Sequence, residues 1–447
     1  MYFRTIYYPI VTQENPETYT IVHAPKRNVS VFRTCRNAKP KRKYKNNSLL
    51  SVVLLFQNRM NPFIKTISNP KFIFILFLAL VVFATLQAIL LTKEHPAPGE
   101  WPYTLYNNYV IFKQSFFHLI HKQDLYCLYP NEYYDPYKYS PAFALAFGVL
   151  SYLPDTAGLL IWNLLNAFVL FAAIYKLPGI AVKYKSLMLL TASIELMTCM
   201  QSCQSNALIV GLLILAFCML EKENYLLATL FISLTVFIKL FGIVICLLFI
   251  FYPKKWKVTL YMLGWFALLA IIPIVATGYE QLLFLYKSWL TPLGNDHALS
   301  NGYSVMGWLH TWFNLNVNKV LALLIGTVLL LLPLIKISKY KNYSFRLVML
   351  SFVLVWMVIF NHMAESPTFI VAVAGVVIWF YAQKLTTQNL ILLMLTIVFT
   401  CLSPTDIFPP YIRKEIFQPY VVKVVPCILI WVKMNYDLLF DKFTFKA

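Results

Sequence analysis

The feature that most constrains this chain is a series of long segments that contain no charged residue. Examples are 72–91, 159–175 and 320–335. At about 1.5 Å per residue, helices of this kind cross a hydrocarbon core about 30 Å thick. Only 13% of the residues are charged, whereas a soluble domain carries about 25%. The chain is therefore predicted to be an all-α, polytopic membrane protein that is embedded in the lipid bilayer.

The net charge of +20 follows the topology expected of such a protein. Residues 1–59 carry 11 Lys and Arg against 2 Asp and Glu, which accounts for +9. Most of the remainder lies in short clusters at 183–185, 254–257 and 336–346. Short basic loops between apolar segments are the positive-inside signal. This distribution argues against a nucleic-acid partner.

The first 59 residues differ from the rest because they are polar and basic and show no clear period. Two interpretations are open. The segment is either a disordered basic cytoplasmic tail or a misassigned extension upstream of a start at Met60. We expect residues 60–447 to form the integral membrane domain.

The cysteines give no sign of a disulfide framework or a metal site. Cys218, Cys246 and Cys427 lie inside apolar segments, and Cys199 and Cys203 have no histidine nearby in the sequence. We therefore expect neither a structural disulfide nor a bound metal.

The alternation of basic and polar connections predicts about twelve transmembrane helices with both termini inside. The two longest connections, 92–155 and 278–317, are then external loops. The predicted spans are 72–91, 156–177, 186–200, 205–220, 225–238, 240–252, 258–277, 318–335, 345–361, 367–382, 389–403 and 420–434.

The first external loop is far longer than a connector needs to be, and loops of this length are usually functional. Nine tyrosines lie between Tyr103 and Tyr139. Residues 107–121 have the spacing of an amphipathic helix, with an aromatic face opposite Asn107, Gln114, His118 and His121. Residues 139–153 are apolar but too short for a span, and they begin with Ser-Pro, which favours a helix start. Two juxtamembrane helices are predicted here.

With this topology, the unusual polar residues gather on the external face. A channel would instead need polar residues through the whole membrane depth. The pattern predicts an active site at the outer interface. The residues concerned are Gln201, Gln204, Asn206, Lys239, Asn295, Asp296, His297, Asn301, His310, Asn361, His362, Glu365 and Ser366.

Two charged residues lie within apolar surroundings. Lys239 is predicted either to bind an anionic group of the substrate or to be a lysine whose amine extends to the membrane edge. Glu195 lies within a predicted span. It is expected either to pair with a basic residue or to be protonated in place.

A set of short motifs follows in order along the first half of the chain. They are Asn108-Tyr-Val-Ile-Phe-Lys, Lys122-Gln-Asp-Leu-Tyr126, Tyr137-Lys-Tyr-Ser-Pro141, Leu153-Pro, Trp162-Asn-Leu-Leu-Asn166, Cys203-Gln-Ser-Asn206 and Ile238-Lys239.

This order of motifs resembles glycosyltransferase family 87 over roughly residues 70–260, with Glu365-Ser-Pro367 as a weaker match further on. The resemblance implies a GT-C architecture and the transfer of a mannose-like hexose from a polyprenyl-phosphate donor. The acceptor would be a lipid-linked or cell-surface glycan outside a bacterial inner membrane. No cofactor is expected.

The resemblance also assigns roles to residues of this sequence. Lys239 would hold the donor phosphate. The sugar or acceptor pocket would be lined by Gln204, Asn206, His297, His362 and Glu365.

One departure affects the catalytic base. The family places an acidic residue early in the first loop, at the position where Asn107 and Asn108 stand here. An asparagine cannot take a proton from an acceptor hydroxyl. We expect Asp135 to be the base because it directly precedes the short apolar helix, with Glu132 as the alternative. Asp124 is expected to stabilise the loop.

Two other functions remain open at this stage. A multi-pass transporter or flippase of lipid-linked glycans would need carboxylates near the midplane of several spans, and only Glu195 fits that description. A non-catalytic glycan-assembly subunit would explain the missing acid at Asn108.

Overall fold

The computed structural model describes residues 62, 64–92, 104–295 and 300–445. Within these residues the chain is helical and forms no β-strand, apart from a single bridge between Gln383 and Phe445. The predicted all-α class is confirmed. The N-terminal tail, 1–59, lies outside the described residues.

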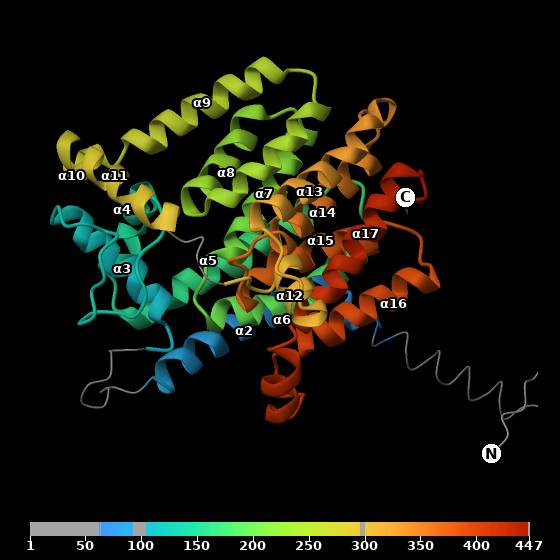
Figure 1. The fold of residues 1–447 in the computed structure, drawn as a ribbon, viewed down its shortest axis with the longest axis horizontal. Coiled ribbons are helices and arrows are strands. Elements are labelled where there is room, and N and C mark those ends of the chain that lie inside the picture. Colours follow the sequence, from blue (N-terminus) through green and yellow to red (C-terminus); the bar gives the residue numbers. More distant parts are fainter. Residues whose placement is uncertain (1–61, 63, 93–103, 296–299, 446–447) are drawn as a thin grey trace, which may run out of the picture. The chain divides into compact units, whose positions relative to one another are not determined.

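The first half of the chain forms helices that run from the first apolar segment to the second long loop (Figure 1). They are α2 (Pro70–Leu90), α3 (Asn107–Ile120), α4 (Pro141–Ser151), α5 (Asp155–Lys176), α6 (Val182–Gln201), α7 (Asn206–Glu221), α8 (Tyr225–Ile238), η1 (Leu240–Phe251), α9 (Lys255–Ile271), α10 (Ile274–Thr277) and α11 (Tyr279–Asn295).

The second half continues with shorter helices, several of which are interrupted by 3₁₀ or π turns. They are α12 (Val305–Phe313), α13 (Lys319–Leu331), η2 (Leu332–Ile335), η3 (Ile337–Lys339), α14 (Tyr343–Ile359), η4 (Ser366–Thr368), α15 (Phe369–Tyr381), α16 (Thr387–Leu395), η5 (Thr396–Leu402), η6 (Ile412–Phe417), η7 (Val422–Val424) and α17 (Val425–Leu439).

Every predicted span coincides with one of these helical segments. Three segments, α2, α5 and the continuous stretch Lys255–Thr277, are long and apolar enough to cross a membrane. Most of the others are apolar helices of 10–17 residues, so the number twelve stays a prediction. The largest difference is in the last span, which was predicted over 420–434, whereas α17 runs from Val425 to Leu439.

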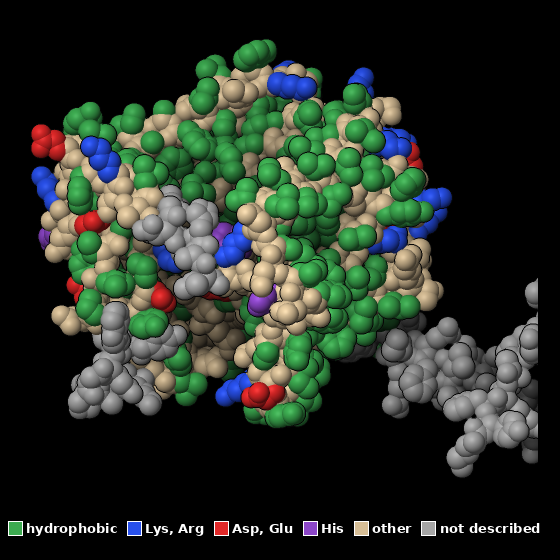
Figure 2. All heavy atoms as spheres, viewed as in Figure 1, with side chains coloured by type: hydrophobic (Ala, Val, Ile, Leu, Met, Phe, Trp, Pro, Cys, Tyr) green, Lys and Arg blue, Asp and Glu red, His purple; other side chains and the backbone are tan. Residues whose placement is uncertain are grey.

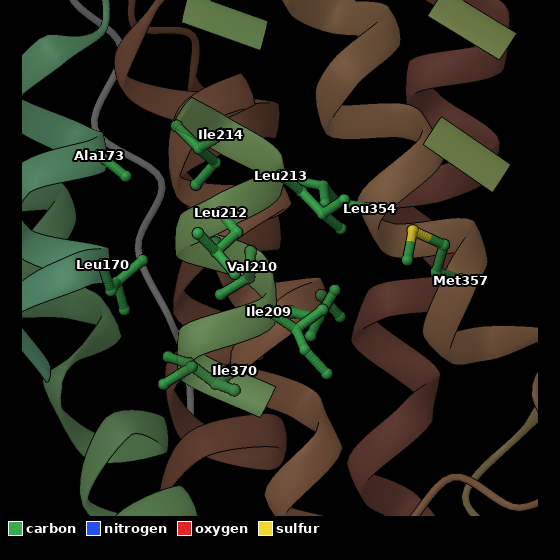
Figure 3. Close-up of a cluster of buried hydrophobic side chains, with 14 of the residues drawn as sticks. Leu170, Ala173, Ile209, Val210, Leu212, Leu213, Ile214, Leu354, Met357 and Ile370 are labelled. Carbon is green, nitrogen blue, oxygen red and sulfur yellow. The ribbon is translucent and has the colours of Figure 1, made fainter. Parts of the chain in front are cut away.

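Helix α7 forms the centre of the core because it is apolar on every side. Nearly all of its side chains are buried against α5, α8, α14 and α15 (Figure 3). Gly211 allows the closest approach, since a Cβ there would lie 2.8 Å from the backbone nitrogen of Leu170 in α5. Small residues at such crossings let membrane helices pack closely.

The polar connections gather at two ends of this helical core. At one end the basic connections carry ion pairs, such as Arg346 to Glu221 at 2.6 Å and Lys254 to Glu223 at 2.8 Å. At the other end, Asn108 donates to the Ser202 carbonyl at 2.8 Å. Much of the surface between is hydrophobic (Figure 2). This is the grouping that the positive-inside pattern predicted.

Both helices predicted in the first loop are present, as α3 and α4, and they pack against each other. Ser140 caps α4 by accepting from the Phe143 amide at 3.2 Å, and Pro141 takes the first helical position. The predicted polar face of α3 was partly wrong. Asn107 and His118 are buried because the rest of the loop folds back over them.

The second long connection, 278–317, is itself largely helical, since it contains α11 and α12. Helix α11 contacts the first loop (Figure 1). Ser288 donates to Asp124 at 2.7 Å, and the indole of Trp289 donates to the Lys138 carbonyl at 3.1 Å. The two connections therefore support each other at the same end of the molecule.

Candidate active site

A polar cavity of about 480 Å³ lies where the first loop meets α2, the end of α6 and the 365–367 segment. On the face drawn in Figure 2, the surface is hollowed near α2 and α6, and basic, acidic and histidine side chains lie around the hollow. The cavity is lined by Ala84, Gln87, Ala88, Leu105, Asn107, Asn108, Asp135, Gln201, Ser202, Gln204, Glu365 and Pro367.

A chain of hydrogen bonds starts at Lys239 and reaches the cavity wall. The Lys239 ammonium donates to Gln204 Oε1 at 3.1 Å and to Asn206 Oδ1 at 2.9 Å. Asn206 Nδ2 donates to Gln204 Oε1 at 2.7 Å, and Gln204 Nε2 donates to Glu365 Oε2 at 2.7 Å. The predicted residues Lys239, Gln204, Asn206 and Glu365 thus form one network.

The ammonium fixes the direction of this whole chain, because it has donors and no acceptor. Both amides must turn their oxygens toward Lys239. The Gln204 NH₂ group then faces Glu365 and holds that carboxylate at the cavity. Among the described residues, no carboxylate lies within ion-pair distance of Lys239.

Helix α5 positions the turn that carries Gln204 and Asn206. The indole of Trp162 donates to the Cys203 carbonyl at 2.9 Å, and Asn166 Oδ1 accepts from the Leu208 amide at 3.0 Å in the first turn of α7. Cys203 has a positive φ of 52°, which is uncommon for a residue other than glycine. The motif from Trp162 to Asn166 therefore has a structural role: it stabilises this turn.

Lys239 interrupts the helical path between α8 and η1, and it lies between the predicted spans 225–238 and 240–252. Its backbone is extended (φ −141°, ψ 124°). The ring of Tyr139 lies 5.9 Å from the ammonium, and Ser140 donates to the Phe237 carbonyl at 2.5 Å. The 139–140 segment of the first loop therefore sits directly against this break.

Asn107 fixes the backbone immediately before Asp135. Its Nδ2 donates to the Tyr134 carbonyl at 2.6 Å, and its Oδ1 accepts from the Tyr134 amide at 3.0 Å. Asp135 itself has a positive φ of 74°. The paired bonds hold Asp135 at the cavity. Asp135 thus supplies a carboxylate to the cavity that the Asn108 amide also lines.

The carboxyl group of Asp135 is exposed at the cavity edge and has no hydrogen bond to another described residue. Partial burial raises the pKa of Asp135, and the carboxylate of Glu365 raises it further, while Lys138 lowers it. A carboxylate whose proton affinity is raised in this way is a better proton acceptor near neutral pH.

A second lysine supports the 365–367 segment from the core side. Lys423 forms a buried ion pair with Glu195 at 2.8 Å and donates to Ser366 Oγ at 2.9 Å. Both charged side chains are almost fully buried. Of the two possibilities for Glu195, the structure shows pairing with a basic residue.

Other candidates lie outside the cavity. Glu132 accepts a hydrogen bond from His118 at 3.0 Å instead, and His118 stacks on Tyr129 with ring centroids 3.8 Å apart. Burial lowers the pKa of His118, against the opposing effect of Glu132. Asp124 accepts from Ser288 and from the Tyr126 amide at 3.1 Å, as expected of a loop-stabilising residue.

The two predicted histidines cannot be placed in the site. His297 lies outside the described residues. His362 lies in the same turn as Glu365, where its carbonyl contacts Gly302, but it does not line the cavity. Among the described residues, no cluster of three or more His, Cys, Asp or Glu has metal-site geometry.

Sequence reasoning missed two contributors, Gln87 and Lys423. Gln87 lies in the apolar helix α2, and it accepts a hydrogen bond from Gln201 at 2.7 Å. A polar side chain within a span is itself a functional signal, and it could have identified Gln87. Lys423 lies within the predicted span 420–434 and gave the same signal, but its contacts with Glu195 and Ser366 depend on tertiary packing.

Comparisons with known proteins give one finding that bears on function. The model of glycosyltransferase family 87 matches residues 137–404. The matched region includes Lys239, Gln204, Asn206 and Glu365, whereas Asn108 and Asp135 precede it. No curated protein matches the chain.

Proposed function

The chain belongs to glycosyltransferase family 87 and is therefore a membrane glycosyltransferase, and we propose that the polar cavity is its active site. The donor is a polyprenyl-phosphate hexose of the mannose type, and the acceptor is a lipid-linked or cell-surface glycan. One observation carries this proposal. A single cavity brings together Asn108, Asp135, Gln204 and Glu365 from separate parts of the chain.

Asp135 acts as the general base. Its carboxylate takes the proton of the acceptor hydroxyl while that oxygen attacks C1 of the donor sugar, and the bond from C1 to the phosphate oxygen breaks. The raised pKa of Asp135 supports this role. Asn108 also lines the cavity and orients the acceptor by hydrogen bonding.

Lys239 balances the charge that develops on the departing polyprenyl phosphate. Its ammonium is bonded to amide oxygens of Gln204 and Asn206 and has no carboxylate partner in the described part of the chain. Its positive charge is therefore not neutralised within that part. Gln204 connects this charge to the cavity, and Glu365 binds sugar hydroxyls. Binding of the sugar or acceptor by His297 and His362 stays a prediction from the sequence.

We place this cavity on the external face of a bacterial inner membrane, with both termini in the cytoplasm. The separation of the basic connections from the polar end of the helices supports this orientation. Residues 60–447 then form one membrane domain, in which 92–155 is the catalytic loop and 278–317 is a supporting external loop.

The test is sugar transfer by the purified full chain in lipid bilayers, with labelled polyprenyl-phosphate mannose and glucose as donors. Asp135→Asn and Lys239→Ala are each expected to reduce transfer by about 10²-fold or more. Asp124→Asn is the matched control, because Asp124 is a carboxylate of the same loop that does not line the cavity. Asp124 instead stabilises the fold by accepting a hydrogen bond from Ser288.

Each outcome has a defined meaning. Transfer that is lost in the two site variants and retained in Asp124→Asn supports the proposal. Full activity of Asp135→Asn would remove Asp135 as the base. A folded wild-type protein that transfers neither sugar would refute the proposed donor class.

A further inference from the structure

Two glutamines that have no role in the proposed reaction meet at the wall of the cavity. Gln201 Nε2, at the end of α6, donates to Gln87 Oε1, in α2, at 2.7 Å. Both side chains line the cavity. A primary amide has two N–H donors and two acceptor lone pairs. This one bond leaves most of that capacity unused, since neither side chain makes another hydrogen bond within the described residues.

The two sides of the cavity differ in how much hydrogen-bonding capacity their amides leave unused. On the Lys239 side, the Gln204 amide is bonded to Lys239, Asn206 and Glu365. On the α2 side, the pair formed by Gln87 and Gln201 still offers donors and an acceptor. A polar residue such as Gln87 is costly in an apolar helix and is usually there for function. The pair is therefore suited to bind a ligand.

The chemistry of the cavity wall narrows the class of ligand. No Lys or Arg is among the described lining residues, whereas two carboxylates, Asp135 and Glu365, are. An anionic acceptor would be repelled beside these carboxylates, whereas the phosphate of the donor is assigned to the Lys239 side. Amides and carboxylates together suit neutral hydroxyl groups, which donate to carboxylates and both donate to and accept from amides.

A second cavity of about 480 Å³ shares Gln201 with the first. Most of its wall is apolar, and it lies between α2, α6 and the 402–407 segment. Its one charged lining residue is Asp406, which forms an ion pair with Arg413 at 2.7 Å and does not favour a phosphate. The lining residues are Leu80, Phe83, Ser193, Ile194, Met197, Thr198, Gln201, Leu402, Pro404, Thr405, Asp406 and Ile407.

We infer that Gln87 and Gln201 bind the hydroxyl groups of a neutral, lipid-linked sugar acceptor, and that the groove beside Gln201 holds its hydrocarbon chain. A ligand with a hydroxyl-rich head and an apolar tail fits a polar cavity and an apolar groove that share one residue. The Lys239 side is left to the phosphate of the donor. This inference rests on the proposed function for the direction of transfer, but the binding itself does not require turnover.

The experiment uses the full chain in bilayers, with octyl and methyl α-mannosides as acceptor probes. Equilibrium binding of both probes is measured first, followed by transfer from polyprenyl-phosphate mannose. The double variant Gln87→Leu/Gln201→Leu is expected to weaken octyl mannoside binding about tenfold or more, because two hydrogen-bonding side chains are lost. The KM for the donor should change less than about threefold.

A second variant tests the groove separately. Ile194→Trp fills the groove without changing an amide, so it should reduce the preference for octyl over methyl mannoside and leave methyl mannoside unchanged. Gln388→Leu is the matched control, because Gln388 is an exposed glutamine that lines neither cavity. An octyl glucuronide should bind more weakly than octyl mannoside, since its carboxylate meets Asp135 and Glu365.

The outcomes separate this inference from the proposed function. Binding that depends on Gln87 and Gln201 in a protein that transfers no sugar supports the acceptor site and refutes the proposed donor. Transfer by the wild type with unchanged octyl mannoside binding in the double variant overturns the inference. A rise in the KM of the donor alone also overturns it, because the glutamines would then belong to the donor.

Discussion

Two lysines are connected to the 365–367 segment, Lys423 directly and Lys239 through Gln204, and their surroundings differ. Lys423 is buried against Glu195 at 2.8 Å and donates to Ser366. Lys239 donates only to the amide oxygens of Gln204 and Asn206, and no described carboxylate lies within ion-pair distance. One positive charge is neutralised within the protein, whereas the other is solvated by dipoles.

This difference agrees with the proposed roles, in which Lys423 stabilises the fold and Lys239 binds the donor phosphate. A buried charge must be paired to be tolerated, and Lys423 meets that requirement within the fold. Amide oxygens stabilise the ammonium of Lys239 without cancelling its charge, so that charge remains available to an anion. The carboxylates follow the same division. Glu195 is paired in the core, whereas Asp135 lies at the cavity without an ion-pair partner among the described residues.

The largest expected effect is on stability, from breaking the core pair. Lys423→Met leaves Glu195 buried without a partner, which costs about 3–5 kcal/mol. Glu195→Leu should cost a similar amount for the same reason. Thermal unfolding in detergent, monitored by circular dichroism, measures both effects.

The double variant sharpens this result. Glu195→Leu/Lys423→Met removes both charges and should recover most of the lost stability, because apolar pairs replace buried ion pairs at little cost. Equal loss in the double variant would show that the hydrogen bond from Lys423 to Ser366, and not charge pairing, stabilises the core.

The opposite pattern is expected at Lys239. Lys239→Met should lower kcat by about 10²–10³-fold, while the unfolding temperature changes by only a few degrees, since no carboxylate is left unpaired. Transfer assays on protein shown to be folded measure this. A large loss of stability without any loss of kcat in the folded fraction would assign Lys239 a structural role and end the contrast.

A charge introduced beside Lys239 would make its surroundings resemble those of Lys423. Asn206→Asp places a carboxylate at the position of an oxygen that now accepts from the ammonium at 2.9 Å. Neutralised in this way, Lys239 should attract the donor phosphate less, and the donor KM should rise about tenfold. The side-chain size is unchanged, so an unaltered KM would show that the charge does not reach the donor.

The sequence alone was sufficient to predict the helical segments, because charge-free runs and basic connections have strong and local physical causes. It also singled out Lys239, Gln204, Asn206 and Glu365, which the structure joins in one hydrogen-bonded network, since polar residues beside apolar segments are unusual. It did not identify the pairing of Lys423 with Glu195, which are 228 residues apart. The burial of His118 was missed for a similar reason: helical periodicity separates two faces of α3 but does not show that the loop covers both.

The smallest expected effect concerns Asp135, whose carboxylate has no ion-pair partner among the described residues. Partial burial and Glu365 raise the pKa of Asp135, so folding favours its protonated form. The contribution of Asp135 to stability is therefore fully present below the pKa that this carboxyl has in the unfolded chain. It is lost as the pH rises through the higher pKa of Asp135 in the folded protein. Asp135→Asn stays uncharged and should be slightly more stable than the wild type at neutral pH, although its sugar transfer is expected to be greatly reduced.

The pH dependence of the wild type should show the same group. Transfer should decline as the pH falls through the raised pKa of Asp135, because the base becomes protonated. Lys138 lowers that pKa, so Lys138→Met should move the decline to higher pH, whereas Glu365→Gln should move it to lower pH. Asp124→Asn, in the same loop, should leave the profile in place. If both Lys138→Met and Glu365→Gln leave the decline where it is, the titrating group is not Asp135. The contrast between charges paired in the core and charges without an ion-pair partner among the described residues would then hold for the lysines alone.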